Sequence, residues 1–134
     1  MDWRKLFDEI HTIAVVGYSH DPARAGHYVP AYLAKQGYEI IAVNPKYVES
    51  VDGHPCYPNL GAIPAGMQID VIDVFRTPSA VPGVAEETLK LDPLPRYFWM
   101  QPGAENEDAA RLVREHGVTP ISHACMLAEH RRLA

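Results

Sequence analysis

The chain has 134 residues, a length that fits one folded domain whose core needs no cross-links. Its 12 basic and 17 acidic residues give a net charge of −5, and there is no basic run of the kind that binds nucleic acid. No apolar stretch reaches the roughly 20 residues of a membrane helix and the N-terminus lacks a signal-peptide core, so we expect residues 1–134 to form a single cytoplasmic domain.

Short apolar runs alternate with helical patterns along the chain. In chain order, these patterns predict a strand at residues 13–16, a helix at 28–35, strands at 38–43 and 71–75, a helix at 80–91, a strand at 97–100, a helix at 106–116, a strand at 118–122 and a closing helix. Gly37 and Gly117 are placed to end helices, Ser79 to begin one, and Pro120 suits an edge strand. The alternation predicts an α/β fold, an open, doubly wound parallel sheet of five strands with helices on both faces.

The residues that follow each strand are candidates for a binding site, because open α/β sheets bind ligands beyond the carboxyl ends of their strands. Gly17 follows the first strand and would let the chain turn sharply beside a ligand, although it could also only relieve crowding. The GxGxxG pattern of dinucleotide-binding loops is absent, since the next glycine is Gly26 and Arg24 lies between them. We expect Gly17→Val to abolish ligand binding at a modest cost in stability, since the strand end should lie near the surface.

Cationic side chains follow the second and third strands. An NAD enzyme normally has Asp or Glu after its second strand, where this chain has Asn44, Pro45 and Lys46. An ammonium there suits a phosphorylated ribose, although a lone lysine after a turn is also an ordinary surface residue. Arg76 directly follows the third strand and adds a second cation at the same edge. Together with the first loop, these cations predict a ligand with several phosphates, one of them on a ribose.

The cysteines and the C-terminal histidines do not form a recognised metal or catalytic motif. His123, Cys125 and His130 match no zinc pattern, and Cys56 and Cys125 form no CxxC pair. We therefore expect no metal site and no disulfide, and a buried, unreactive thiol at Cys125.

Six segments together resemble one family. In order they are VVGYS, VNPK, GHPCYPNL, IDVIDVFRTP, WMQPGAENEDAA and CMLAEHRRL. The series resembles the small stand-alone CoA-binding proteins, whose domain is similar to the N-terminal CoA-binding domain of the succinyl-CoA synthetase alpha subunit. The resemblance covers nearly the whole chain and implies a Rossmann-like domain that holds CoA across the carboxyl edge of its sheet.

The strand ends and the resemblance together select the residues expected to bind CoA. They are Gly17, Tyr18, Ser19, Arg24, Asn44, Pro45, Lys46, Phe75, Arg76, Thr77, Pro78, Trp99, Met100 and Gln101. Trp99 and Met100 are apolar enough to suit the core equally well, whereas Gln101 stands where the fourth strand ends.

The chain departs from the usual family motifs at two places. Members often read RPSYRV where this chain reads RAGHYV, so Gly26 replaces a hydroxyl-bearing residue and Tyr28 a basic one. Members also often read DRC where this chain has His123, Ala124 and Cys125. The first departure bears on the strength of CoA binding, and the second lies in a segment without an assigned role.

We therefore expect a protein that binds CoA or acyl-CoA and has no catalytic activity of its own. The synthetases with a similar domain use a phosphorylated histidine from a separate ligase domain, for which this chain has no room. Two alternatives stay open. One is an NADP-dependent oxidoreductase in which Lys46 and Arg76 hold the ribose phosphate, and the other is a regulatory partner of an acyl-CoA ligase subunit.

Overall fold

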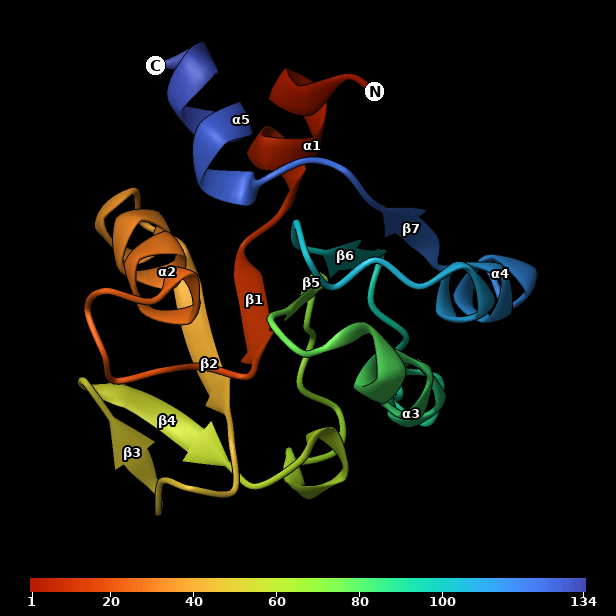
Figure 1. Cartoon of the computed structure of the whole chain (residues 1–134), viewed down its shortest axis with the longest axis horizontal. Coiled ribbons are helices and arrows are strands. Elements are labelled where there is room, and N and C mark those ends of the chain that lie inside the picture. Colours follow the sequence, from red (N-terminus) through yellow and green to blue (C-terminus); the bar gives the residue numbers. More distant parts are fainter.

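A seven-stranded sheet forms the middle layer of the computed structural model, which describes all residues from 1 to 134 (Figure 1). Its strands are β1 (Thr12–Val16), β2 (Glu39–Val43), β3 (Ser50–Val51), β4 (His54–Tyr57), β5 (Val71–Val74), β6 (Tyr97–Met100) and β7 (Thr119–Ile121), in the spatial order β3-β4-β2-β1-β5-β6-β7. Neighbouring strands are parallel, except that β3 runs antiparallel to β4. The α/β fold with a mostly parallel sheet is confirmed, and β7 lies at an edge as Pro120 predicted.

The sheet has two strands more than expected, because the β3–β4 hairpin extends it beyond β2. Asp52 and Gly53 form the hairpin turn, with φ angles of 51° and 82°. β3 has only two residues and β4 contains Pro55, so neither strand has the apolar run that marks β1, β2, β5 and β6.

Five α-helices cover the two faces of the sheet (Figure 1). Helices α1 (Trp3–Glu9), α2 (Ala25–Lys35) and α5 (Met126–Leu133) pack on one face, while α3 (Val81–Thr88), α4 (Glu107–Glu115) and the short 3-10 turn η1 (Leu60–Ala62) pack on the other. Gly37 and Gly117 follow the ends of α2 and α4 with φ angles of 99° and 89°, as expected. Ser79 does not cap α3, because it lies inside a 3-10 turn, η2 (Pro78–Ala80), that directly precedes the helix.

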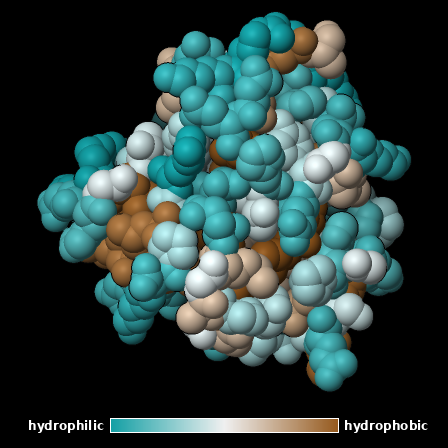
Figure 2. Space-filling view, turned by 180° about the vertical axis from the view of Figure 1, so that it is seen from behind, coloured by the Kyte–Doolittle hydropathy of each residue, from teal (hydrophilic) through white to brown (hydrophobic).

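Strands β1, β2, β5 and β6 are buried on both faces, which explains their mainly apolar sequences. In β1, Ala14 and Val16 belong to the core layer beneath α3 and α4, whereas Ile13 and Val15 belong to the layer beneath α1, α2 and α5. None of the helices combines the length and the apolar character needed to cross a membrane. Figure 2 shows one face of the molecule covered mainly by hydrophilic side chains, with a few smaller apolar areas.

Candidate functional site

The loops that follow β1, β2, β5 and β6 meet at the carboxyl edge of the sheet. The main-chain hydrogen bonding continues for one residue beyond all four of these strands. The N–H groups of Gly17, Asn44, Phe75 and Gln101 donate to the last carbonyls of β2, β4, β1 and β5 at 3.0, 2.9, 2.8 and 3.2 Å. The start of each loop is therefore fixed by the sheet itself.

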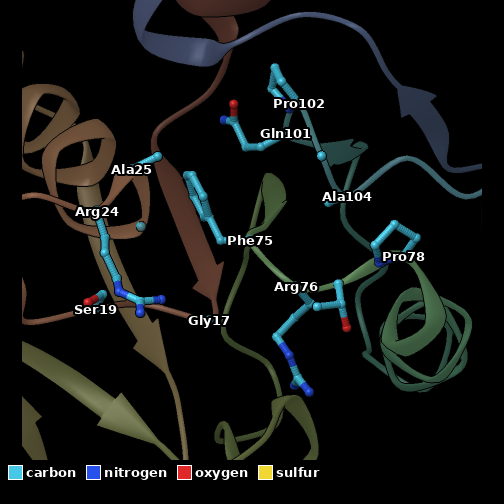
Figure 3. A pocket seen from close by; sticks show the side chains of 13 residues that line it. Gly17, Ser19, Arg24, Ala25, Phe75, Arg76, Pro78, Gln101, Pro102 and Ala104 are labelled. Atoms are coloured by element: carbon cyan, nitrogen blue, oxygen red, sulfur yellow. The ribbon is translucent and has the colours of Figure 1, made fainter.

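Two adjoining hollows lie at this edge. The first hollow, of about 400 Å³, lies between the loop after β1, the start of α2 and the loops after β5 and β6 (Figure 3). The second hollow, of about 560 Å³, lies between the loop after β1 and the loop after β2. Gly17, Ser19 and Arg24 line both hollows. The two hollows therefore form one elongated site.

Three cationic side chains line this site. Arg24 and Arg76 belong to the first hollow, and Figure 3 shows them extending from opposite sides with Gly17 between them. Lys46 lines the second hollow, which Arg24 also borders. The Arg24 guanidinium has a single carboxylate nearby, that of Asp21 at 3.8 Å, and remains largely exposed. The distribution of charge favours an anionic ligand that reaches into both hollows.

The start of α2 presents free N–H groups to the first hollow. Arg24 is the N-cap residue of this helix, and its side chain makes no capping hydrogen bond. The main-chain N–H groups of Ala25 and Gly26, which line the hollow, donate to no other protein group. A helix N-terminus carries a partial positive charge, so these N–H groups suit a phosphate.

Two glycines allow the loop after β1 to pack closely. Gly17 has a φ of 88°, and a Cβ atom there would lie 2.4 Å from the carbonyl oxygen of Phe75. A Cβ atom on Gly26 would lie 2.9 Å from the carbonyl oxygen of Gly17. The expectation that Gly17→Val costs little stability is therefore wrong, because its side chain would meet main-chain atoms. Gly26 therefore does more than remove the hydroxyl that family members often have at this position, because the absence of a side chain lets α2 approach the loop.

Hydrogen bonds from Asn44 hold the second hollow in shape. Its Nδ2 donates to the carbonyl oxygen of Tyr18 at 2.9 Å, and its Oδ1 accepts from the N–H of Lys46 at 2.9 Å. The Tyr47 hydroxyl accepts from the N–H of His20 at 2.9 Å. The loops after β1 and β2 are thus joined at two points, and Lys46 is held at the rim.

The Tyr18 side chain is buried and ties the loop after β1 to the β3–β4 hairpin. Its hydroxyl donates to Asp52 Oδ2 at 2.8 Å, and burial followed by this hydrogen bond raises the pKa of Tyr18 well above its usual value. Asp52 also lies 2.6 Å from Nδ1 of His20 and 3.4 Å from Nδ1 of His27. Burial opposes ionisation of Asp52, but hydrogen bonds from Tyr18 and His20 lower its pKa. The carboxylate therefore stays charged and holds the loop.

A second carboxyl group is enclosed beneath the first hollow. Asp73 of β5 is fully buried, and its Oδ1 accepts a hydrogen bond from Gln101 Nε2 at 2.7 Å. Its Oδ2 is the one enclosed side-chain oxygen or nitrogen atom in the protein without a partner. Burial raises the pKa of Asp73 to about 8, and the hydrogen bond from Gln101 lowers it by a smaller amount. Asp73 is therefore mainly protonated at neutral pH.

The two hollows bring together most of the residues selected from the sequence. The first hollow contains Gly17, Ser19, Arg24, Phe75, Arg76, Thr77, Pro78 and Gln101, and the second contains Gly17, Tyr18, Ser19, Arg24, Asn44 and Lys46. Pro45 lies outside both and lines a neighbouring hollow with Tyr47 and Val48.

The prediction that Trp99 and Met100 contact the ligand is wrong. Both are completely buried, on opposite faces of β6. The Trp99 ring stacks on Trp3 with 5.2 Å between centroids, and its Nε1 donates to the carbonyl oxygen of Ala124 at 2.7 Å. Gln101, the first residue after the strand, is where this part of the chain reaches the site.

Residues 123–125 have a structural role at the start of α5. The Ala124 carbonyl fixes the Trp99 ring, and Cys125 is the N-cap residue of the helix. His123 has a φ of 59° and lies 3.8 Å from the Glu105 carboxylate. Cys125 is partly exposed rather than buried as expected, and it lies outside both hollows.

Sequence reasoning missed the lining residues that surround the selected ones. They are Ala25, Gly26, Pro102, Gly103 and Ala104 in the first hollow and His20, Asp21 and Tyr47 in the second. The only feature of the sequence that could have identified such residues is their position, since residues 102–104 directly follow Gln101. Asp73 had a signal of a different kind, a single acidic residue in an otherwise apolar strand.

Known proteins are similar to this chain in sequence. Residues 11–131 match the sequence model of a family described as the CoA binding domain. YneT of Bacillus subtilis (strain 168) is 38% identical over 127 residues, which cover 95% of this chain and 90% of that protein.

Solved structures of other proteins are also similar to this chain. A protein from Thermus thermophilus has a TM-score of 0.91 at 33% identity, with both chains covered completely. A protein from Pyrococcus horikoshii OT3 has a TM-score of 0.89 at 33% identity and covers 98% of this chain and 89% of its own. The dinucleotide-forming acetyl-coenzyme A synthetase 1 of Ca. Korarchaeum cryptofilum has a TM-score of 0.70 at 25% identity, over 89% of this chain and 27% of that one. The chain therefore belongs to the CoA-binding domain family.

Proposed function

We propose that the protein binds CoA or acyl-CoA along its two hollows and has no catalytic activity of its own. The observation that carries this proposal is that two hollows share Gly17, Ser19 and Arg24 and together form one elongated site. The second hollow adds Lys46, whereas the first adds Arg76, free main-chain N–H groups and the apolar side chains of Phe75 and Pro78. CoA is likewise elongated, with a phosphorylated nucleotide at one end, a pyrophosphate in the middle and a pantetheine arm at the other end.

The residues at each hollow match one part of CoA. Lys46 would bind the phosphate on the ribose, because an ammonium is a good point-charge partner for a phosphate. Arg24 and the free N–H groups at the start of α2 would bind the pyrophosphate. The apolar residues of the first hollow, Phe75, Pro78 and Ala104 among them, would contact the pantetheine arm.

The absence of catalysis is proposed from the state of the Ser19 hydroxyl, which belongs to a residue that lines both hollows. Ser19 Oγ accepts a hydrogen bond from the N–H of Asp21 at 3.1 Å and forms no hydrogen bond with a basic side chain, since the nearby His27 ring is 2.9 Å from the Ser19 carbonyl oxygen instead. Catalytic serines are activated by an adjacent general base, so this hydroxyl is held as a loop-forming group. The partly exposed thiol of Cys125 lies outside both hollows.

Calorimetry with CoA, dephospho-CoA and NADP tests the proposal. CoA should bind about tenfold more tightly than dephospho-CoA, because the contact of Lys46 with a phosphate is charge-assisted but solvent-exposed. Lys46→Ala should remove this preference, and Lys35→Ala, an exposed lysine at the far end of α2, should keep it. Preference for NADP over CoA, or no binding of CoA, would contradict the proposal.

A further inference from the structure

Asp73 is an unfavourable residue for the place it occupies. It lies in the middle of the sheet, in register with Val15 of β1 and Trp99 of β6, and is completely buried. One carboxyl oxygen accepts from Gln101, and the other has no hydrogen-bond partner. Burial of an unsatisfied polar group destabilises a protein, so an apolar residue would serve the fold better. The one contact that the carboxyl group makes leads toward the ligand site.

Gln101 connects this buried carboxyl group to the first hollow. Its side chain is almost fully buried, yet it lines the hollow (Figure 3). Nε2 is directed toward Asp73, and Oε1 accepts no hydrogen bond from the protein. Asp73 Oδ2 is the only enclosed side-chain oxygen or nitrogen atom without a hydrogen-bond partner. Gln101 Oε1 also has no partner in the protein, so it is not enclosed and is open to the hollow. The site thus presents a hydrogen-bond acceptor at this point.

We infer that Asp73 is a positioning residue, which turns the Gln101 carboxamide so that its Oε1 accepts a hydrogen bond from an amide N–H of the pantetheine arm. This inference rests on the proposed function. A glutamine side chain can present either its donor or its acceptor end, and in this structure Nε2 donates to Asp73 Oδ1, which leaves the acceptor end for the hollow. The phosphates of CoA are acceptors, its thiol is only a weak donor, and the donors of its adenosine belong to the nucleotide, which we place in the second hollow. The strong donors left for Gln101 are those of the pantetheine arm, two amide N–H groups and one hydroxyl, and the amides are the more numerous.

The surroundings of Gln101 support this match. Phe75 and Ala104 line the hollow beside it, so the contact is made in a partly apolar environment. Burial raises the pKa of Asp73 to about 8, and the only other influence on it is the hydrogen bond from Gln101. The carboxyl group is therefore mainly neutral at pH 7 and brings little negative charge beneath an anionic ligand.

The test compares two ligands, CoA and 3′-phosphoadenosine 5′-diphosphate (called the bisphosphate below), which keeps the 3′-phosphate and the pyrophosphate and lacks the pantetheine arm. Gln101→Leu and Asp73→Leu should each weaken CoA binding about 3- to 10-fold, the effect of one neutral hydrogen bond, and leave binding of the bisphosphate unchanged. Asp73→Asn keeps an acceptor oxygen for Gln101 Nε2 and should bind CoA as the parent does. The double variant of Asp73→Leu and Gln101→Leu should lose no more than either single variant.

Two outcomes would overturn the role of Asp73. One is parental CoA affinity in Asp73→Leu, and the other is an equal loss for both ligands, which would indicate a general distortion of the site. If the parent bound the bisphosphate and CoA with equal affinity, the pantetheine contact itself would be absent. If the parent bound neither ligand, the proposed function would fail and this inference with it. Circular dichroism of each variant establishes that it is folded.

Discussion

Replacing Asp73 with asparagine should change how the stability of the protein depends on pH. Asparagine has nearly the same shape as aspartic acid and can still accept the hydrogen bond from Gln101, but it does not titrate. A comparison of the two proteins therefore isolates the proton on the buried carboxyl group.

The sign and size of the effect follow from the shift of the Asp73 pKa, which rises from 3.8 to about 8 on burial. Between these values the folded protein holds a proton that the unfolded chain has released, so the free energy of unfolding falls as the pH rises. The slope is about 1.4 kcal/mol per pH unit, which gives a loss of about 3 kcal/mol between about pH 5 and pH 7.5. The contribution of the neutral acid is complete below about pH 4 and is lost above about pH 8.

Urea unfolding, followed by circular dichroism at several pH values in this range, measures the effect. The free energy of unfolding of the parent minus that of Asp73→Asn should fall steadily, by about 3 kcal/mol in all, as the pH rises from about 5 to 7.5. Burial lowers the pKa of His54 and His130, so these residues reduce stability as the pH falls, but they are common to both proteins and cancel. A difference that stays constant from about pH 5 to pH 7.5 would refute the assignment of a protonated, buried Asp73.

Two further changes test the loop after β1 and the thiol near the C-terminus. Gly17→Ala should lower the free energy of unfolding by about 3 kcal/mol or more, because the new Cβ atom meets main-chain atoms. The control is Gly37→Ala, which has a positive φ but open space around it and should cost only about 1 kcal/mol. Equal losses in thermal unfolding would show that the close contact at Gly17 is unimportant. Cys125→Ser should leave CoA affinity and stability nearly unchanged, and mass spectrometry after incubation with acyl-CoA should find no acyl group on Cys125 of the parent; an adduct would contradict a purely binding function.

The sheet could be predicted from the sequence to the extent that its strands are buried on both faces. Residues 13–16 and 71–74 are continuous apolar runs apart from Asp73, because helices cover them above and below. The β3–β4 hairpin has no such signal, since one of its strands has two residues and the other contains Pro55. Its Asp52-Gly53 pair was the available signal, and it specifies a turn without specifying what flanks it.

The site could be predicted where a residue directly follows a strand. Gly17, Arg76 and Gln101 reach the hollows because all parallel strands end at the same edge. Trp99 shows the limit of this reasoning, since a side chain inside a strand is enclosed by the layers and stays away from the edge. The interaction of Asp73 with Gln101 depends on which residues of two separate strands lie side by side, and the sequence of either strand contains no such information.

The packing of α1 against α5 has a consequence for the synthesis of the protein. Leu6 and Phe7 from the first helix and Met126 from the last are buried in the same core layer, and Phe7 contacts the His130 ring with 5.1 Å between centroids. The ribosome makes α1 before α5, so the apolar side of α1 has no helix to pack against until α5 has been translated. The layer beneath α3 and α4 includes no residue of α1 or α5. The opposite layer cannot close until α5 has been made, so the apolar side of α1 stays open to chaperones until then.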